Sequence, residues 1–306
     1  MNNKLVKNIL NVVSDLKETP SGAYSIRING VSDKIISNEN VQIIKKEDKP
    51  GIDIIVKPNT INETIYIPVV IFESGIEEKV YNDFYIGENS QVKIIAGCGI
   101  HNDGHQKIAH NGIHTFNLEK KSAVSYQEKH YGEGKGTGEK VLNPVTIINL
   151  KESSYLEMES IQINGVDSTK RETIAVLDDN ATLITKEIIM TDGNQVAETD
   201  FKIDLNGKNS KATISSRSVA KGKSKQVFTS VINGNNECIG HSECDAIIMD
   251  ESIVKAVPDV TANHKDALLI HEAAIGKIAK DQIIKLMTLG LTQEESEQEI
   301  INGFLR

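Results

Sequence analysis

One segment of the chain concentrates side chains that bind metals. Four histidines follow a cysteine in CGIHNDGHQKIAHNGIHTF, which begins at Cys98. Neutral imidazole and thiolate are good ligands for zinc and iron, so Cys98, His101 and His105 form a candidate metal site. The spacing matches no common zinc-finger pattern, and the glycines in and beside the segment favour a loop over a helix. A solvated polar loop is the competing interpretation.

Two further groups lie nearer the C-terminus. The segment NNECIGHSECDAIIMDES spaces Cys238, His241 and Cys244 like half of a metal site. Alternate residues of a strand face opposite sides, so the two cysteines share a face only in a regular strand, and a buried structural cysteine is the alternative. His271 and Glu272 follow an apolar run in LLIHEAAIG. For this pair the alternative is a strand edge that turns toward solvent.

Motifs for nucleotide binding and for nucleophilic catalysis are missing. The glycine-rich segment YGEGKGTGEK has neither the Walker A spacing nor the G-x-G-x-x-G order, so we interpret it as a flexible loop. We find no nucleophile in a setting such as G-x-S-x-G. The sequence therefore predicts a protein without a nucleotide site of its own and favours a non-enzymatic role.

Composition narrows the class of protein. The 306 residues include 34 Lys and Arg against 43 Asp and Glu, and the net charge of −9 argues against general nucleic-acid binding. No apolar run is long enough to span a membrane, and the N-terminus does not read as a signal peptide. Three cysteines are too few for a disulfide framework, so we expect a cytoplasmic protein. Only 4% of residues are aromatic, which makes a solenoid enzyme acting on polysaccharide an unfavourable alternative.

The elements that must position these residues fall into three regions. Residues 1–20 have apolar side chains at helical spacing, among them Leu5, Ile9, Val12 and Leu16. This pattern predicts an amphipathic helix that packs on its own domain, with a partner-binding helix as the alternative. In residues 276–306, Gly290 is placed to end one helix and Thr292 with Glu295 forms a capping box for the next, so we expect a helical hairpin.

Residues 21–275 have the pattern of a β-rich core. Short β-branched segments such as SQVKI, ATLIT and KATIS alternate with polar turns at intervals of roughly thirty residues, which favours a repeat array. Stacked units of this size bury a continuous core, so a β-solenoid is the leading architecture. A β-sandwich is the rival, and the lack of helices between the strands argues against an α/β fold.

Longer motifs resemble a known family. GHSECDAIIMD, PDVTANHKDALLIHEAAIGKI and DQIIKLMTLGLTQEESEQEIINGF, within residues 240–306, are similar to SufB and SufD, the scaffold proteins of the SUF iron–sulfur cluster assembly system. The stretch from Gly97 to Ile163, with YGEGKGTG and LNPVTIINL, resembles the short SufB-like branch. The resemblance implies a right-handed parallel β-helix followed by a C-terminal helical domain, in agreement with the solenoid.

The resemblance also implies a function and partners. The family's scaffolds pair through the ends of their β-helices, and their C-terminal helices, here residues 276–306, dock a SufC-like ABC ATPase. Sulfur comes from a cysteine desulfurase, and the cargo is a transient iron–sulfur cluster of unspecified type. We expect a second SufB-like chain as partner, either a homodimer or a paralogue, and neither nucleic acid nor membrane insertion. The alternative is a coupling subunit of the ATPase complex that binds no cluster.

Three residues carry over from the family motifs. Cys244 matches the SufB cysteine held to be cluster ligand or sulfur acceptor, His271 matches the interface histidine, and Glu272 matches the acidic residue beside it. The resemblance leaves Cys98 with its histidines as an extra iron site of this branch. Full-length members have a larger N-terminal helical domain, whereas this chain has about one helix there. Because one chain holds both the cysteine and the histidine motif, a homodimer is an open hypothesis.

Overall fold

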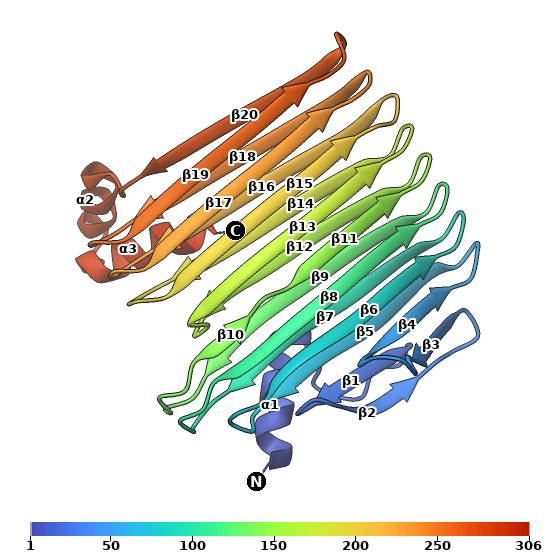
Figure 1. The fold of residues 1–306 in the computed structure, drawn as a ribbon. Coiled ribbons are helices and arrows are strands. Elements are labelled where there is room, and N and C mark those ends of the chain that lie inside the picture. Colours follow the sequence, from blue (N-terminus) through green and yellow to red (C-terminus); the bar gives the residue numbers. More distant parts are fainter. Residues whose placement is uncertain (1, 306) are drawn as a thin grey trace.

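The strands of this protein stack as the turns of a solenoid. The structure, a computed structural model, describes residues 2–305, and it contains a β-solenoid of about 8 turns with a short N-terminal helix and two C-terminal helices (Figure 1). The solenoid prediction is confirmed and the β-sandwich alternative is wrong, because nearly every strand pairs in parallel with the strand one turn away.

Each turn contributes a strand to each of two sheets. The strands of sheet A, in spatial order, are β2 (Val31–Ile36), β1 (Tyr24–Ile28), β5 (Ile61–Ile71), β7 (Gln91–His101), β9 (Ala123–Glu133), β12 (Tyr155–Asn164), β14 (Thr182–Thr191), β16 (Ser210–Ala220), β18 (Cys238–Ile248) and β20 (Ala267–Gly276). Those of sheet B are β19 (Ile253–Ala262), β17 (Lys225–Gly234), β15 (Val196–Leu205), β13 (Ser168–Leu177), β10 (Lys140–Leu142), β8 (Ile108–Leu118), β6 (Glu77–Ile86), β4 (Gly51–Val56) and β3 (Val41–Lys45), with β11 (Val145–Leu150) between β8 and β13.

The polar turns of the sequence form one corner of the solenoid. Asn89, Asn180 and Asn209 adopt the left-handed backbone conformation there, with φ between 56° and 57°. Asparagine tolerates this conformation better than most residues, which explains its recurrence at the corner. Asn209 lies one turn after Asn180 and hydrogen-bonds to it through the side chains. The repeat seen in the sequence is therefore the length of one turn.

Apolar side chains from both sheets meet between them and form the main core. Alternate residues of each strand point inward, as the buried–intermediate alternation along β13 and β15 shows. The rings of Phe84 and Phe116 stack with centroids 4.3 Å apart, and Tyr126 meets both edge-on. All three rings are buried. This packing fixes the register of the turns in the first half of the solenoid.

Helix α1 (Asn2–Ser14) covers part of the outer face of sheet A. Its Ile9 and Val13 are buried against Gly97 and Gly99 of β7. A Cβ on Gly99 would lie 2.1 Å from Cγ2 of Ile9, so the glycine permits this close approach. The prediction that the helix packs on its own domain is confirmed.

Helices α2 (Lys280–Thr288) and α3 (Gln293–Phe304) follow the last strand. The predicted capping box is present at Thr292 and Glu295, and Gly290 has a φ of 99° just after α2. Ile301 of α3 is buried in a cluster with Val219 and Ile247 of sheet A, whereas α2 has no buried residue. Within residues 2–305, no helix is long and apolar enough to cross a membrane.

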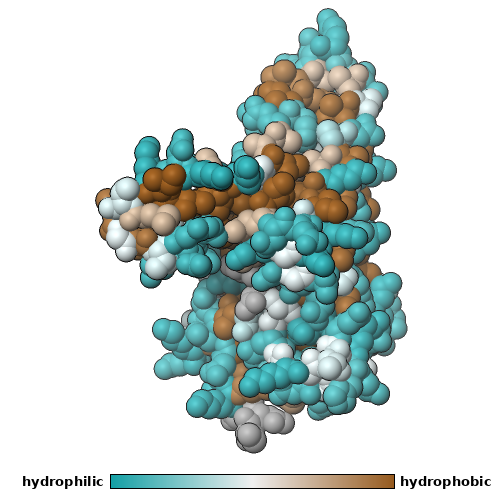
Figure 2. Space-filling view, turned by 90° about the vertical axis from the view of Figure 1, so that its left-hand side faces the viewer, coloured by the Kyte–Doolittle hydropathy of each residue, from teal (hydrophilic) through white to brown (hydrophobic). Residues whose placement is uncertain are grey.

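The two ends of the solenoid differ. Antiparallel hairpins, β1–β2 and β3–β4, close the N-terminal end with edge strands of five and six residues. At the C-terminal end, β19 and β20 are ten-residue edge strands that no further strand of residues 2–305 covers (Figure 1). Figure 2 shows a hydrophobic band on the side of the molecule that carries this end and the helices. The exposed apolar residues of the end and of the segment after it are Ile253, Val260, Leu268, Ile270, Ile275, Ile284, Met287 and Leu289.

Candidate functional site

One row of inward-facing side chains crosses the middle of sheet A and ends at Cys244. Strand pairing places Glu128, Ser160, Glu187, Ser216 and Cys244 side by side on five successive strands. Neighbouring strands lie about 4.8 Å apart, so adjacent members of the row are close neighbours. Ser216 Oγ donates a hydrogen bond of 3.0 Å to Glu187 Oε2. The row therefore brings polar groups up to the thiol from within the solenoid.

The Cys244 thiol is buried but lies close to the C-terminal end of the solenoid. We call this end, where no strand in the described part of the chain covers the edge strands β19 and β20, the bare end. Cys244 is 1% exposed, and burial raises the pKa of the thiol to about 12, with the negative charges of Glu187 and Asp245 adding to the effect. The thiol is therefore protonated at neutral pH. Cys244 of β18 pairs with Ala273 of the terminal strand β20. Ala273 is exposed and carries only a methyl group. One strand thus separates the sulfur from the open end.

His271 lies on the inner face of the terminal strand. It pairs with Ser242, an inward-facing residue two positions before Cys244. Its Nδ1 has no hydrogen-bond partner among the described residues. Burial, aided by the charge of His241, lowers the pKa of His271. A neutral imidazole with an unused ring nitrogen is the form that binds metal ions.

Glu272 does not join Cys244 and His271 within one chain. Adjacent residues of a strand face opposite sides, and Glu272 lies on the outer face of sheet A. There its Oε2 is 3.6 Å from Nε2 of His241, and it pairs with Glu243 across the ladder. The structure therefore places two of the three residues predicted from the family motifs on the inner face and leaves the third outside.

An ion network lies inside the solenoid, and it was not predicted from the sequence. The Arg171 guanidinium lies 3.2 Å from Glu187 and 3.6 Å from Glu128, and its Nη2 is 3.1 Å from Nδ1 of His130. Burial raises the pKa of Glu187, and the Arg171 charge opposes that rise. Thr199 donates a further hydrogen bond to Glu187. One signal in the sequence could have indicated the network. Charged residues such as Arg171 in STKRETIAVL take inward positions in strands that otherwise alternate between inward and outward residues.

The predicted metal site at Cys98, His101 and His105 does not form in this structure. Cys98 points inward into a small apolar cluster, and burial raises the pKa of its thiol well above the usual range. His101 faces the other way, 2.9 Å from each of Asp103 and Glu133, and the exposed His105 bonds to the Thr137 hydroxyl. In residues 2–305, no three His, Cys, Asp or Glu side chains form a group suited to a metal ion.

The loop interpretation of this segment holds only for residues 102–107, because Cys98–His101 end strand β7. Residues Ile108–Leu118 form strand β8, and His110 and His114 are buried. His110 Nδ1 lies 2.7 Å from Glu78, and His114 Nδ1 lies 2.9 Å from the Tyr126 hydroxyl. Buried polar partners, which the local sequence does not reveal, allow these histidines to lie inside a strand.

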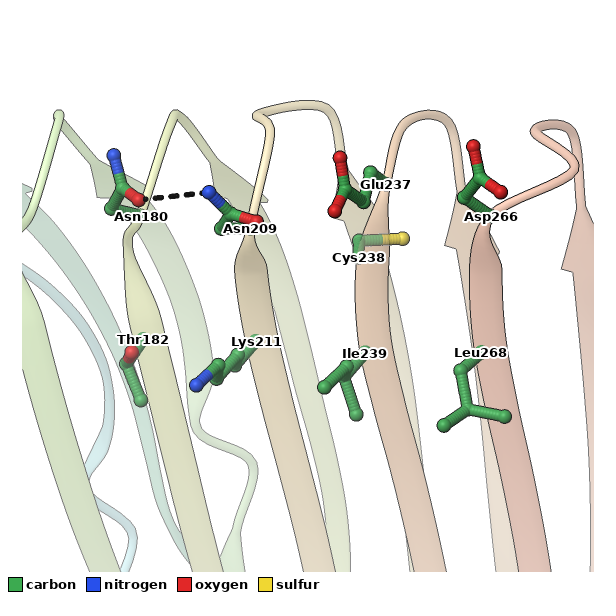
Figure 3. A pocket seen from close by; sticks show the side chains of 9 residues that line it. All are labelled: Asn180, Thr182, Asn209, Lys211, Glu237, Cys238, Ile239, Asp266 and Leu268. Carbon is green, nitrogen blue, oxygen red and sulfur yellow. Dashed lines mark hydrogen bonds between the residues drawn. The ribbon is translucent and has the colours of Figure 1, made fainter.

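Cys238 and Cys244 do not form half of a metal site. Both face inward from β18, but they are six positions apart, or about 20 Å along a strand. His241 faces outward. Cys238 instead lies at the solenoid corner, beside an open groove whose polar lining comes from successive turns (Figure 3). The polar residues of this lining include Asn180, Asn209, Glu237 and Asp266.

Comparison with known proteins agrees with this architecture. Residues 82–304 match the family model of the SUF system FeS cluster assembly SufBD core domain. A SufBD family protein of iron–sulfur cluster assembly from Archaeoglobus fulgidus is 31% identical over 232 residues, which cover 75% of this chain and 61% of that protein. One from Pyrococcus horikoshii is 27% identical over 289 residues, covering 93% of this chain and 85% of the relative.

Coverage of other relatives is partial. The match to a SufBD family protein of Methanothermobacter thermautotrophicus is 28% identical and covers 77% of this chain but 57% of the relative. The chain thus spans about three fifths of the Archaeoglobus and Methanothermobacter proteins. The family model nevertheless covers most of the solenoid and both C-terminal helices, so this chain belongs to the SufBD family of iron–sulfur cluster assembly proteins.

Proposed function

We propose that this chain is a cytoplasmic, non-enzymatic scaffold subunit of a SUF-type assembly complex. It receives sulfur and iron as cargo at a site that forms between two chains, and a partner ABC-type ATPase drives the complex. The observation that carries the proposal is the position of Cys244 and His271 on the inner face of the last two strands of sheet A, beside a bare end. A thiolate accepts sulfur and binds iron, and a neutral imidazole can complete an iron coordination shell.

The bare end supports an inter-subunit site. Long uncovered edge strands offer rows of unpaired N–H and C=O groups to another chain. Leu268 and Ile270 on β20 are 54% and 40% exposed, which is unusual for residues this apolar unless a partner covers them. The partner is a second SufB-like chain, either another copy or a paralogue. Glu272 on the outer face would then contribute at the rim of the contact rather than beside the thiol.

The C-terminal hairpin, residues 276–306, supplies the docking surface for a SufC-like ATPase. Helix α2 packs against the cluster around Ile301 through Ile283. Its Ile284 is 57% and its Met287 44% exposed, and Leu289 just after it is 79% exposed. An amphipathic helix that presents this much apolar surface is suited to a groove on a partner. Helix α3, anchored on sheet A through Ile301, transmits movement of the ATPase to the end of the solenoid.

The protonated state of Cys244 suggests what the ATPase does in the complex: it drives the opening that lets this thiol lose its proton. The thiol must lose its proton before it accepts sulfur from a cysteine desulfurase or binds iron. Displacement of the terminal turn exposes the sulfur to water and removes the burial that keeps its pKa high. Coupling of ATP use to this opening therefore limits the reactive thiolate to the assembly step.

Anaerobic reconstitution with ferrous iron and sulfide tests the proposal. The unaltered chain, co-expressed with its ATPase and scaffold partners, is expected to develop visible charge-transfer absorption that Cys244→Ser abolishes. Cys238→Ser is the matched control, because Cys238 is an equally buried, inward-facing cysteine of the same strand. Equal absorption from all three proteins would exclude Cys244 as the site.

One observation favours a second candidate function. Because the Cys244 thiol is buried and protonated, the chain can also serve as a coupling subunit that binds no cluster and transmits ATPase movement to a cluster-binding paralogue. The same reconstitution, repeated with the ATPase but without any other scaffold chain, separates the two functions. A coupling subunit gives no absorption when it is the only scaffold chain present, yet it still captures the ATPase.

A further inference from the structure

A small cavity lies among the side chains in the middle of the solenoid. The volume within it that the centre of a water molecule can occupy is about 30 Å³. Its lining includes Glu128, Arg171, Thr185 and Glu187, all of them buried. The cavity therefore touches the buried ion network but lies several turns from the bare end.

Two groups at this cavity lack a hydrogen-bond partner among the described residues. They are the hydroxyl of Thr185 and the Nε–H of Arg171, and each residue is 4% exposed. Arg171 Nε is 3.2 Å from Glu187 Oε1 as an ion pair, but this contact lacks hydrogen-bond geometry. Buried polar groups in folded proteins nearly always have a partner, in the protein or in ordered water.

The charges around the cavity define what can occupy it. The carboxylates of Glu128 and Glu187 disfavour an anion, and the guanidinium of Arg171 disfavours a cation. Unsatisfied polar groups disfavour an apolar molecule. The remaining class is an uncharged molecule of one heavy atom that both donates and accepts hydrogen bonds. A water molecule needs about 10–15 Å³ of such room and two to four polar partners.

We propose that this cavity is a binding site for one or two water molecules, held by the Thr185 hydroxyl and the Arg171 Nε–H. Water accepts from Arg171, exchanges a hydrogen bond with Thr185 and donates to the carboxylate of Glu187. It completes the solvation of an ion network that the protein atoms alone leave short of partners. The waters thereby let charged residues persist at the centre of a solenoid whose core is otherwise largely apolar.

Two measurements test the site. A high-resolution crystal structure of the unaltered chain is expected to show ordered density within hydrogen-bond distance of Thr185 Oγ1. The substitution Thr185→Val, which keeps the shape but removes the hydroxyl, is expected to lower the melting temperature by roughly 2–4 °C, because it removes a partner of the water. Thr199→Val is the control, because its hydroxyl already bonds to Glu187 and its loss destabilises in either case.

The sign of the effect at Thr185 decides the question. In a dry cavity the hydroxyl is unbonded, and its replacement by a methyl group raises the melting temperature instead. A rise for Thr185→Val, or a cavity without density in the crystal, would overturn the proposal. If Thr185→Val does not fold, the density in the unaltered chain decides alone.

Discussion

Removal of the buried histidine His114 tests how the interior of the solenoid responds to acid. Its ring lies among aromatic side chains, with Nδ1 2.9 Å from the hydroxyl of Tyr126. Burial lowers its pKa from 6.5 to about 4, while the negative charge of Glu128 opposes the shift and the nearby His110 and His130 add to it. The folded chain therefore holds this imidazole neutral where the unfolded chain protonates it.

The sign and size of the effect follow from the shift. Between pH 6.5 and about pH 4, His114 is protonated in the unfolded state but neutral in the folded state. The stabilising contribution of the neutral His114 is therefore fully present above pH 6.5 and is lost as the pH falls through this range. One pKa unit corresponds to about 1.4 kcal/mol, so His114 accounts for a loss of about 3 kcal/mol in the free energy of unfolding once both states are protonated. At pH 5 the expected loss is about 2 kcal/mol.

Urea unfolding followed by circular dichroism measures this loss at about pH 7.5 and about pH 5. His114→Asn is expected to reduce the difference between the two free energies of unfolding by about 2 kcal/mol. Some acid sensitivity remains, because burial also lowers the pKa of His130. His105→Asn, at an exposed histidine, serves as the control. An unchanged pH dependence in His114→Asn would refute the argument from burial.

Three other substitutions probe the core, the helix contact and the docking surface. Phe84→Ala removes one ring of the stack with Phe116, and a urea titration is expected to show a loss of about 3–5 kcal/mol; a loss under about 1 kcal/mol would contradict this packing. Gly99→Ala forces a Cβ into α1 and is expected to speed hydrogen exchange there, whereas Gly276→Ala, with nothing within 4 Å, leaves exchange unchanged. Ile284→Asp is expected to change the free energy of unfolding by less than about 0.5 kcal/mol yet abolish capture of a SufC-like ATPase; persistent capture would exclude this face of α2.

The solenoid could be predicted because its signals are local. Polar corner segments such as Lys208-Asn209-Ser210 recur once per turn of the solenoid. The alternation of residue types in KATIS indicates which side chains face inward. The capping box at Thr292 is equally local, since both of its hydrogen bonds join residues three positions apart. These features depend on neighbours in sequence, which a single sequence displays.

The candidate site was harder to predict because it depends on register between turns. Nothing near Cys244 in sequence indicates that Ser216 and Glu187 precede it in a row across sheet A, since 28 and 57 residues separate them from it. Strand β8 was missed because Gly112 and its histidines have the composition of a loop. The opposite orientations of His271 and Glu272, in contrast, follow from their adjacency in a strand and were open to prediction.

The difference between the two ends of the solenoid limits what the molecule can build. Short antiparallel hairpins cap the N-terminal end, while the C-terminal end presents the ten-residue edge strands β19 and β20. In a pair joined through the two C-terminal ends, as proposed, both N-terminal hairpins point outward, so neither long edge strand of residues 2–305 is left to pair with a third copy. In the proposed pairing, strand addition therefore stops at two chains and does not continue into a filament.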